Sequence, residues 1–539
     1  MSRLSKFAEK EHSEELKIKE SSVKNFMGGT SYKISPINTL RIIASSSIFG
    51  EPQYYRDNGI GSPKNIETLN LYSINEFIFQ DNKSAIEVFE QAIDNSLEFD
   101  FKSTLDLALE LRTLYLMRLN PSIIFTRASM HPNRKSFNEN NPGYMKSIGK
   151  SIAKRPDDLT NQFEYYMFKN GKKNGLPSLI KRTWAERLEE YSRYQLNKYK
   201  GKKLIDLIRI SHANNENINE LMRNGKLEVN DNELTWEALR SQGKQWTEII
   251  ETISIPHMAL LRNLRGIFKE IEDSKLASNI LQKLKDGVKG GNQFPFRYWS
   301  AYKSVKNADV NHKQLILDSI EECIDISVDI MPKLKGKTIC LSDNSGSAWG
   351  SFNSEYGEVT VAEIGNLSSV ITSVCSDEGE IGVFGDRLEK ISISKRNGIL
   401  TQLKRVSNIG GKQGSSTENG IWIFFDEAIN NKIHYDNIFI YSDMQAGHGG
   451  LYGEDQVAQS DYVHTNGGTY IDVLAMARDY RKKVNPKANI FTVQTAGYDN
   501  SVIPENIYRG SILSGWTGKE SLFAKSIIEI WDSIENTKN

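Results

Sequence analysis

Residues 337–347 read KTICLSDNSGS, a short apolar run that ends in a carboxylate and two serines. The run KTICLS predicts a buried β-strand, and Asp343, Ser345 and Ser347 then occupy alternate positions of the following loop. In open α/β sheets, ligands bind at the carboxyl ends of the strands. Three hard oxygen ligands at this spacing suit Mg²⁺ or Mn²⁺, but the bare pattern is more typical of an ordinary turn or helix cap.

The sequence that follows this stretch alternates between short β-prone runs and helical patterns. Strands are predicted at 337–342, 380–385, 390–394, 437–442 and 489–495, and helices at 359–374, 417–429 and 469–484. Such alternation is typical of a doubly wound α/β sheet. Residues 337–539 are therefore predicted to form one α/β domain.

Two further oxygen donors favour a metal site in this domain. Thr417 opens a predicted helix after the loop GGKQGSS, and Asp443 ends the strand NIFIYS. Loops at strand ends and helix starts converge on one rim of a parallel sheet. The constellation resembles the metal-ion-dependent adhesion site of a von Willebrand factor A domain. The matching positions are Asp343, Ser345, Ser347, Thr417 and Asp443, and Mg²⁺ is the expected cation, with Mn²⁺ as the alternative.

The chain before residue 337 has a helical pattern. In residues 256–271, Leu260 and Leu264 fall on one face and Arg262 and Arg265 on the opposite face, at 100° per residue. Many such segments in succession predict a stacked array of HEAT-like helical repeats over residues 31–336. Residues 1–30 are predicted to be a polar tail.

Composition and charge are those of a multidomain globular protein. The chain has 539 residues, of which 38% are hydrophobic, and equal numbers of basic and acidic side chains, 68 of each. This neutral total hides a gradient, because residues 1–336 hold 50 basic and 43 acidic side chains, whereas residues 337–539 hold 18 and 25. Three widely spaced cysteines and the lack of a long apolar run predict a cytoplasmic protein without disulfides or a membrane span.

The richest basic stretch covers residues 188–215 and mixes lysines with tyrosines. Lysines release counterions from a phosphate backbone and aromatic rings stack on bases, so this composition fits single-stranded RNA. A solvated lysine-rich loop is an equally good interpretation of the composition alone. A smaller cluster around Arg127 and Arg134 is more typical of a solvated surface. The candidate RNA-binding residues are Lys198, Lys200, Lys202, Arg209, His212, Arg127, Arg134 and Arg262.

Three enzymatic interpretations are disfavoured. An aspartyl-phosphate phosphatase needs a second Asp two residues after the first, and that position is Ser345. The run GWTGKES (515–521) lacks the first glycine of a phosphate-binding P-loop. A metal-dependent phosphohydrolase would need a general base beside the metal loop, and the sequence places none there. The protein is therefore expected to be non-catalytic.

A basic helical array followed by an A-type domain resembles the Ro autoantigen family, with its bacterial Ro-related (Rsr) members. These proteins combine a TROVE domain with a von Willebrand factor A domain. The resemblance extends over nearly the whole chain after the N-terminal tail. The stretches that carry it are LELRTLYLMRLNP (109–121), KYKGKKLIDLIRISH (198–212), MALLRNL (258–264), NQFPFRYWSAYKSVK (292–306) and the Asp343–Ser347 motif.

The resemblance implies a closed ring of HEAT-like repeats, monomeric, with its ends held together by the A domain. It implies a ribonucleoprotein that binds small noncoding Y RNAs on its outer surface and single-stranded 3′ ends of misfolded RNAs in its central hole. Such a protein acts in RNA quality control or RNA stability, with an exoribonuclease as a further partner. Lys198 and His212 match family residues that contact RNA. Lys202 stands at a family arginine, where a lysine keeps the charge but loses bidentate phosphate geometry.

A second hypothesis remains open for the same sequence. In this alternative, the chain is a protein-interaction scaffold whose A domain binds an acidic ligand of a partner protein through the divalent cation. It predicts metal-dependent protein binding and RNA affinity no better than nonspecific. The two hypotheses are compatible if they concern different faces of the protein.

Overall fold

The computed structural model falls into two compact units, each described here by itself. The helical unit holds residues 36–46 and 85–254, and the mixed unit holds residues 17–35 and 255–536, apart from the gaps given next. The structure describes residues 17, 19–24, 30–46, 85–171, 175–228, 235–291, 293–349, 351–354, 357–414, 418–444, 463–465, 469–495, 500–505, 507–515 and 518–536.

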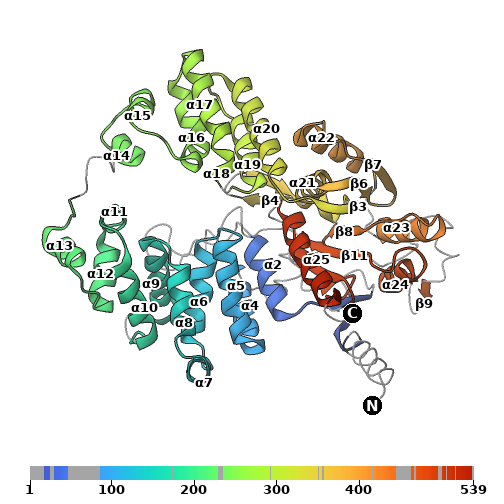
Figure 1. The fold of residues 1–539 in the computed structure, drawn as a ribbon, viewed down its shortest axis with the longest axis horizontal. Helices are drawn as coiled ribbons and strands as arrows, with labels where there is room; N and C mark the ends of the chain where they lie inside the picture. Colours follow the sequence, from blue (N-terminus) through green and yellow to red (C-terminus); the bar gives the residue numbers. More distant parts are fainter. Residues whose placement is uncertain are drawn as a thin grey trace. The chain divides into compact units, whose positions relative to one another are not determined.

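The helical unit consists of short antiparallel helices that pack on their sequence neighbours (Figure 1). Its helices are α2 (Pro36–Ser46), α4 (Ala85–Phe99), α5 (Phe101–Thr113), α6 (Leu119–Met130), α7 (Arg134–Asn140), α8 (Tyr144–Ile152), α9 (Pro156–Asn170), α10 (Ser178–Glu190), α11 (Arg193–Lys198), α12 (Lys202–Ser211), α13 (Glu216–Asn224), α14 (Trp236–Ser241) and α15 (Trp246–Thr252). Local sequence explains several helix starts. Asp100 caps α5 by accepting from the amide of Ser103, and Pro156 occupies the first turn of α9.

Five helices of the mixed unit precede its large sheet in the sequence. They are α16 (His257–Glu270), α17 (Ser274–Asp286), α18 (Val288–Gly291), α19 (Pro295–Lys306) and α20 (Lys313–Asp329). The two-sided pattern predicted for α16 is confirmed, because Leu260 and Leu264 are buried whereas Arg262 and Arg265 are exposed. Burial of that apolar stripe is the main source of stability for a helix of this length.

A six-stranded sheet follows in the mixed unit, with the order β13-β11-β8-β3-β6-β7. The strands are β3 (Leu334–Asp343), β6 (Ser376–Phe384), β7 (Leu388–Ser392), β8 (Asn437–Ser442), β11 (Asn489–Gln494) and β13 (Gly510–Ser514). Neighbouring strands are parallel except for the β6–β7 pair. All five predicted strands are confirmed, and β13 is a sixth strand that the sequence analysis did not include.

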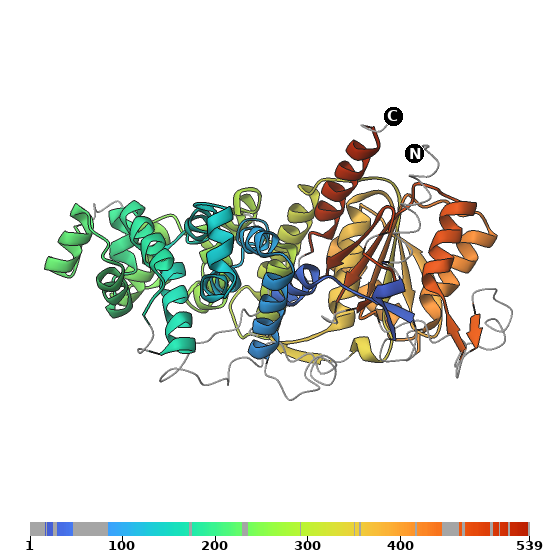
Figure 2. The same cartoon turned by 90° about the horizontal axis from the view of Figure 1, so that it is seen from below.

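Helices cover both faces of this sheet, as Figure 2 shows. They are α21 (Val361–Val374), α22 (Ile399–Gly410), α23 (Glu418–Asn430), α24 (Val473–Lys483) and α25 (Glu520–Asn536). Alternate residues of β8 point to opposite faces. Ile438 and Ile440 join a core cluster with α23 and α24, whereas the hydroxyl of Tyr441 lies 2.7 Å from that of Thr372 on α21.

The direction of the chain changes at the centre of the sheet. From β3 the chain builds outward to β6 and β7, and it then returns to the other side of β3 to build β8, β11 and β13. The order of the strands therefore reverses between β3 and β8. In doubly wound folds such a switch point leaves a crevice at the carboxyl ends of the two strands, where ligands bind.

Part of the predicted polar tail forms a small sheet with the C-terminal half of the chain. Strands β1 (Ser22–Lys24), β2 (Thr30–Lys33) and β12 (Asn500–Ser501) pair in that order. The hydroxyl of Ser31 donates to the side chain of Asn500 at 3.0 Å. Five further short elements are η4 (Ser347–Trp349), β4 (Ser351–Ser354), β5 (Gly357–Thr360), β9 (Val463–Thr465) and β10 (Thr469–Ile471), and β9 pairs with β10.

The predicted fold class, mainly helical with a doubly wound α/β part, is confirmed. The change from helices to the α/β sheet occurs at Leu334, close to the predicted boundary, whereas the compact units divide at residues 254 and 255. The domain boundaries and closure of the ring stay predictions. Cys323, Cys340 and Cys375 are free and buried, in agreement with the expected lack of disulfides. Within the described residues, no helix has both the length and the apolar composition that crossing a bilayer requires.

Candidate functional site

The predicted RNA-binding residues of α11 and α12 lie at the surface of the helical unit. Exposed side chains in this region are Lys198, Lys200, Lys202, Arg209 and His212. Lys202 and Arg209 are seven residues apart on α12, nearly two full turns, so they lie on one face of the helix. The fold therefore collects these charges at the end of α11, in the loop that follows it, and along α12 to its C-terminal cap. We call these five residues the α11–α12 basic surface.

Lys198 is held in place by two neighbours. Its ammonium lies 3.4 Å from the hydroxyl of Tyr194 and 5.7 Å from the centre of that ring, and 3.5 Å from Glu237. Partial burial lowers the pKa of Lys198, but the Glu237 carboxylate and the Tyr194 hydroxyl outweigh burial, so the pKa is raised overall. The lysine keeps its charge, and its contact with Tyr194 places a cation beside an aromatic ring.

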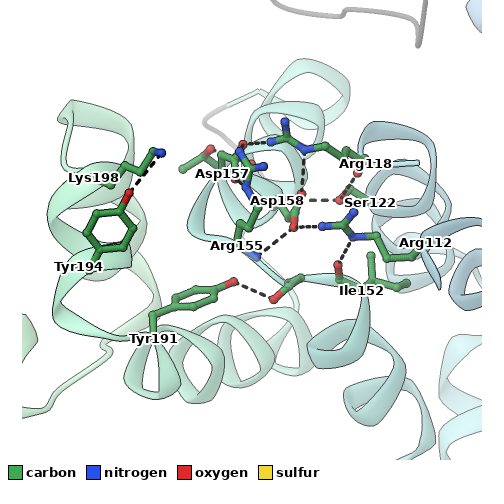
Figure 3. A network of polar contacts seen from close by, with 12 residues as sticks. Arg112, Arg118, Ser122, Ile152, Arg155, Asp157, Asp158, Tyr191, Tyr194 and Lys198 are labelled. Atoms are coloured by element: carbon green, nitrogen blue, oxygen red, sulfur yellow. Dashed lines mark hydrogen bonds and ion pairs between the residues drawn. The ribbon is translucent and has the colours of Figure 1, made fainter. Parts of the chain in front are cut away.

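Arg155 supports the loop between α11 and α12. Its guanidinium lies over the ring of Tyr199, 5.3 Å from the ring centre. Its backbone amide donates to the buried carboxylate of Asp158 at 3.0 Å. Asp158 in turn accepts from Arg112 at 2.8 Å (Figure 3). The loop between α11 and α12, which carries Tyr199, is therefore connected to a buried network of α5 and α9. The sequence does not predict this network, because its members are far apart in the chain.

His212 ends α12 in a left-handed conformation, with φ of 61°. Histidine is among the side chains that adopt this conformation more often than most non-glycine residues. The turn that follows is fastened to α10, because Glu189 accepts from the amide of Asn214 and from the side chain of Asn215, both at 2.9 Å. The exposed imidazole of His212 therefore stands on an anchored turn.

The other three RNA candidates belong to other helices than α11 and α12. Arg127 is paired inside the helical unit, donating to Asp94 at 2.6 Å and to the Tyr165 hydroxyl at 3.1 Å. Its charge is balanced within the protein, which gives it a role in packing α6. Arg134 is half-buried and contacts backbone carbonyls of its own turn. Arg262 is exposed on α16, in the mixed unit.

The predicted cation ligands Asp343 and Asp443 lie on the two sides of the switch point of the sheet. Ser342 of β3 pairs with Tyr441 of β8, so the two carboxylates come at the ends of neighbouring parallel strands. Both are buried. Burial, and then the charge of Asp443, raise the pKa of the Asp343 carboxyl above its ordinary value.

Residues around Asp343 fit a divalent cation. Asp343 accepts from the Ser442 hydroxyl at 2.7 Å and from the Ser345 amide at 2.9 Å, and neither donor carries a charge. Two adjacent buried carboxylates repel one another, and either a proton or a bound cation relieves this repulsion. Carboxylate and hydroxyl oxygens are the ligands that Mg²⁺ and Mn²⁺ prefer. Asp343, Asp443 and the buried Ser345 would hold the ion.

The remaining two predicted ligands are placed only in part. Ser347 is the first residue of the short helix η4, so this helix begins directly after the predicted loop. Thr417 lies outside the described residues, directly before α23. The predicted ligand set therefore stays a prediction at these two positions.

Comparison with known proteins agrees with this architecture. Residues 220–323 match the TROVE domain. The crystal structure of the Ro (Rsr) protein of Deinococcus radiodurans is similar, with a TM-score of 0.55 and 14% sequence identity over 80% of this chain and 93% of that one. No curated protein matches the chain in sequence. At this identity the structural likeness shows the fold alone. The chain therefore has the fold of the Ro (Rsr) protein and contains a region, residues 220–323, that matches the TROVE domain, in agreement with the family that its sequence resembles.

Proposed function

We propose that this protein is a non-catalytic RNA-binding protein of the Ro type. The TROVE match and the Ro fold support RNA binding. In this proposal the α11–α12 basic surface binds the backbone of small structured Y-type RNAs, and single-stranded 3′ ends of misfolded RNAs enter a central hole of the helical array. The protein then acts in RNA quality control or RNA stability, and it passes RNA to an exoribonuclease.

One observation carries the proposal. Lys198, Lys200 and Lys202 are exposed within five residues, beside Tyr194 and Tyr199. Lysines at such density attract phosphates, and the rings offer stacking faces for unpaired bases. Only Lys198 of these three makes an ion pair among the described residues, at 3.5 Å, so the charge remains available to a polyanion.

The test is filter binding of the purified protein to three nucleic acids over a salt series. They are a structured RNA with a single-stranded 3′ tail, the same RNA with a blunt end, and duplex DNA. We expect the tailed RNA to bind most tightly, with an affinity that falls steeply with salt. Lys200→Ala and Lys202→Ala should each reduce the slope of log affinity against log salt by about 1, if each lysine contacts a phosphate.

Lys102→Ala is the matched control, because Lys102 is an exposed lysine on α5, outside the α11–α12 basic surface. His212→Ser and Lys198→Ala test the two positions that match family RNA contacts. Equal and weak binding to all three nucleic acids, unaffected by these substitutions, would contradict the proposal.

We also propose that the rim of the α/β sheet binds Mg²⁺ or Mn²⁺ through Asp343, Asp443 and Ser345, with Ser347 and Thr417 completing the set. The adjacent buried carboxylates support it. Through the ion this rim would bind an acidic side chain of a partner protein. Titration of the full chain with Mn²⁺, followed by electron paramagnetic resonance of the free ion, should show one site that Asp443→Ala removes. Binding that survives this substitution would place the ion elsewhere.

A further inference from the structure

Two buried asparagines lie behind the loop that carries the proposed cation ligands. Asn344 stands between Asp343 and Ser345, and Asn366 lies on α21. Their side-chain amides form a reciprocal pair: Nδ2 of each donates to Oδ1 of the other, both at 2.9 Å. Both side chains are fully buried. We call this contact the amide pair.

The backbone of Asn344 is held as well as its side chain. Its amide donates to the carbonyl of Phe384 at 2.7 Å, and its carbonyl accepts from the indole of Trp349 at 3.0 Å. Nδ2 of Asn344 also donates to the carbonyl of Ser342 at 3.1 Å, and the Ser342 hydroxyl donates to Oδ1 of Asn366 at 2.7 Å. Every polar group of Asn344 therefore has a partner, and the amide pair is joined to the end of β3.

Helix α22 closes the other side of the amide pair. Gly410 packs so tightly that a Cβ atom there would lie 2.0 Å from Oδ1 of Asn344. Ser407, one turn earlier, lies 3.5 Å from Nδ2 of Asn366. Asn344 is thus enclosed by β3, α21 and α22. A side chain with this many contacts has one orientation, so the peptide that joins the two ligand residues has one orientation too.

We propose that Asn344 and Asn366 are positioning residues for the cation site, which the Proposed function assigns to this rim. Neither amide is a ligand. The amide pair fixes the loop so that Asp343 and Ser345 present their oxygens to the ion without a cost of ordering. Removal of outer-shell partners that orient metal ligands typically costs 10–100-fold in metal affinity.

The experiment measures the Mn²⁺ dissociation constant of the full chain by electron paramagnetic resonance of the free ion. Asn366→Ala removes one half of the amide pair and leaves Asp343, Ser345 and Asp443 intact. Gly410→Ala perturbs the same pair sterically while every polar group is retained. Both variants should raise the dissociation constant at least tenfold while circular dichroism shows the native secondary structure. If Asn366→Ala does not fold, Gly410→Ala decides.

Gly411→Ala is the matched control. Gly411 follows Gly410 at the end of α22, but a Cβ atom there would meet its nearest neighbour, the Ser407 carbonyl, at an ordinary 3.7 Å. This variant should bind Mn²⁺ as the wild type does. Wild-type affinity in both Asn366→Ala and Gly410→Ala, with Asp443→Ala inactive in binding, would overturn the positioning role and leave the cation site standing. No Mn²⁺ binding by the wild type would overturn both.

Discussion

The guanidinium of Arg112 donates to the carboxylate of Asp158 at 2.8 Å, and both side chains are buried in the helical unit. The same guanidinium donates to the carbonyls of Ile152 and Met117, at 2.9 and 3.1 Å. Asp158 also accepts from the amide of Arg155, whose side chain lies over Tyr199. One buried ion pair thus joins α5 and α9 to the loop of the α11–α12 basic surface.

Asp158→Ala should destabilise the helical unit by about 3–5 kcal/mol, because it leaves the charge of Arg112 buried without its partner. It also removes the acceptor for the Arg155 amide at the start of α9. Thermal unfolding followed by circular dichroism measures the effect. Asp157→Ala is the control, since Asp157 is 23% exposed and pairs with arginines near the surface. If the two variants lose similar amounts of stability, the buried ion pair of Asp158 contributes no more than the more exposed ion pairs of Asp157.

Gly149→Ala should destabilise the helical unit by about 1–3 kcal/mol. Gly149 lies on α8, and a Cβ atom there would come within 2.3 Å of the Phe125 ring and 2.8 Å of a Thr183 methyl group. These atoms belong to α6 and α10, so the helices would have to separate. Gly175→Ala, where a Cβ atom meets nothing within 4 Å, should leave the midpoint of thermal unfolding nearly unchanged. If Gly175→Ala lowers the midpoint as much as Gly149→Ala does, the loss of stability comes from the change of backbone freedom and not from the steric clash.

Arg155→Ala should weaken RNA binding with little effect on stability. The substitution removes the cation over Tyr199, a contact worth about 1 kcal/mol at most in a partly exposed place, or about fivefold in affinity. The backbone amide that binds Asp158 is retained. Arg155→Lys keeps a cation and should recover part of the affinity. If Arg155→Ala binds RNA as tightly as the wild type, Tyr199 is not part of the RNA-binding surface.

Glu535→Gln should lower stability at neutral pH by about 1 kcal/mol, and this difference should disappear in acid. Hydrogen bonds from Arg509 and Tyr508 lower the pKa of Glu535 to about 2. A depressed carboxyl pKa contributes stability above its unfolded value and loses it as pH falls through the folded value. The wild-type advantage should therefore shrink below about pH 4.5 and vanish near pH 2.

Thermal midpoints of Glu535→Gln and the wild type at pH 7, 5 and 3 provide the measurement. The control is Glu529→Gln, which changes an exposed carboxylate of the same helix, α25. A difference between Glu535→Gln and the wild type that stays constant with pH would mean that the charge of Glu535 does not stabilise the C-terminal helix.

Much of the fold could be predicted from local pattern. The apolar runs of β3 and β8 and the two-sided helix α16 are visible within about 15 residues of sequence, since burial imposes a period on the chain. The pairing of β2 with β12 could not be predicted. It joins residues whose positions differ by nearly 470, as in the contact between Ser31 and Asn500. No local sequence pattern distinguishes the short strand β2 from a polar tail.

The candidate sites show the same division. Charge and exposure along α12 follow from its helical period, so Lys202 and Arg209 could be assigned to one face in advance. The sequence favoured a solvated surface for Arg127, but this arginine pairs with Asp94 of another helix, 33 residues away. Likewise, Asn344 reads as an ordinary loop residue until α21 and α22 are packed against it.

The sequence alone therefore determined the two-part architecture and the basic stretch around Lys198, and it predicted the oxygen ligands of the proposed cation site, because periodicity and side-chain chemistry are local properties. Only the tertiary structure decided which charges are neutralised inside the protein, as for Arg127 and Arg112, and which amides hold the loop of Asp343. These outcomes depend on distances between elements remote in the chain, and such distances are set by packing.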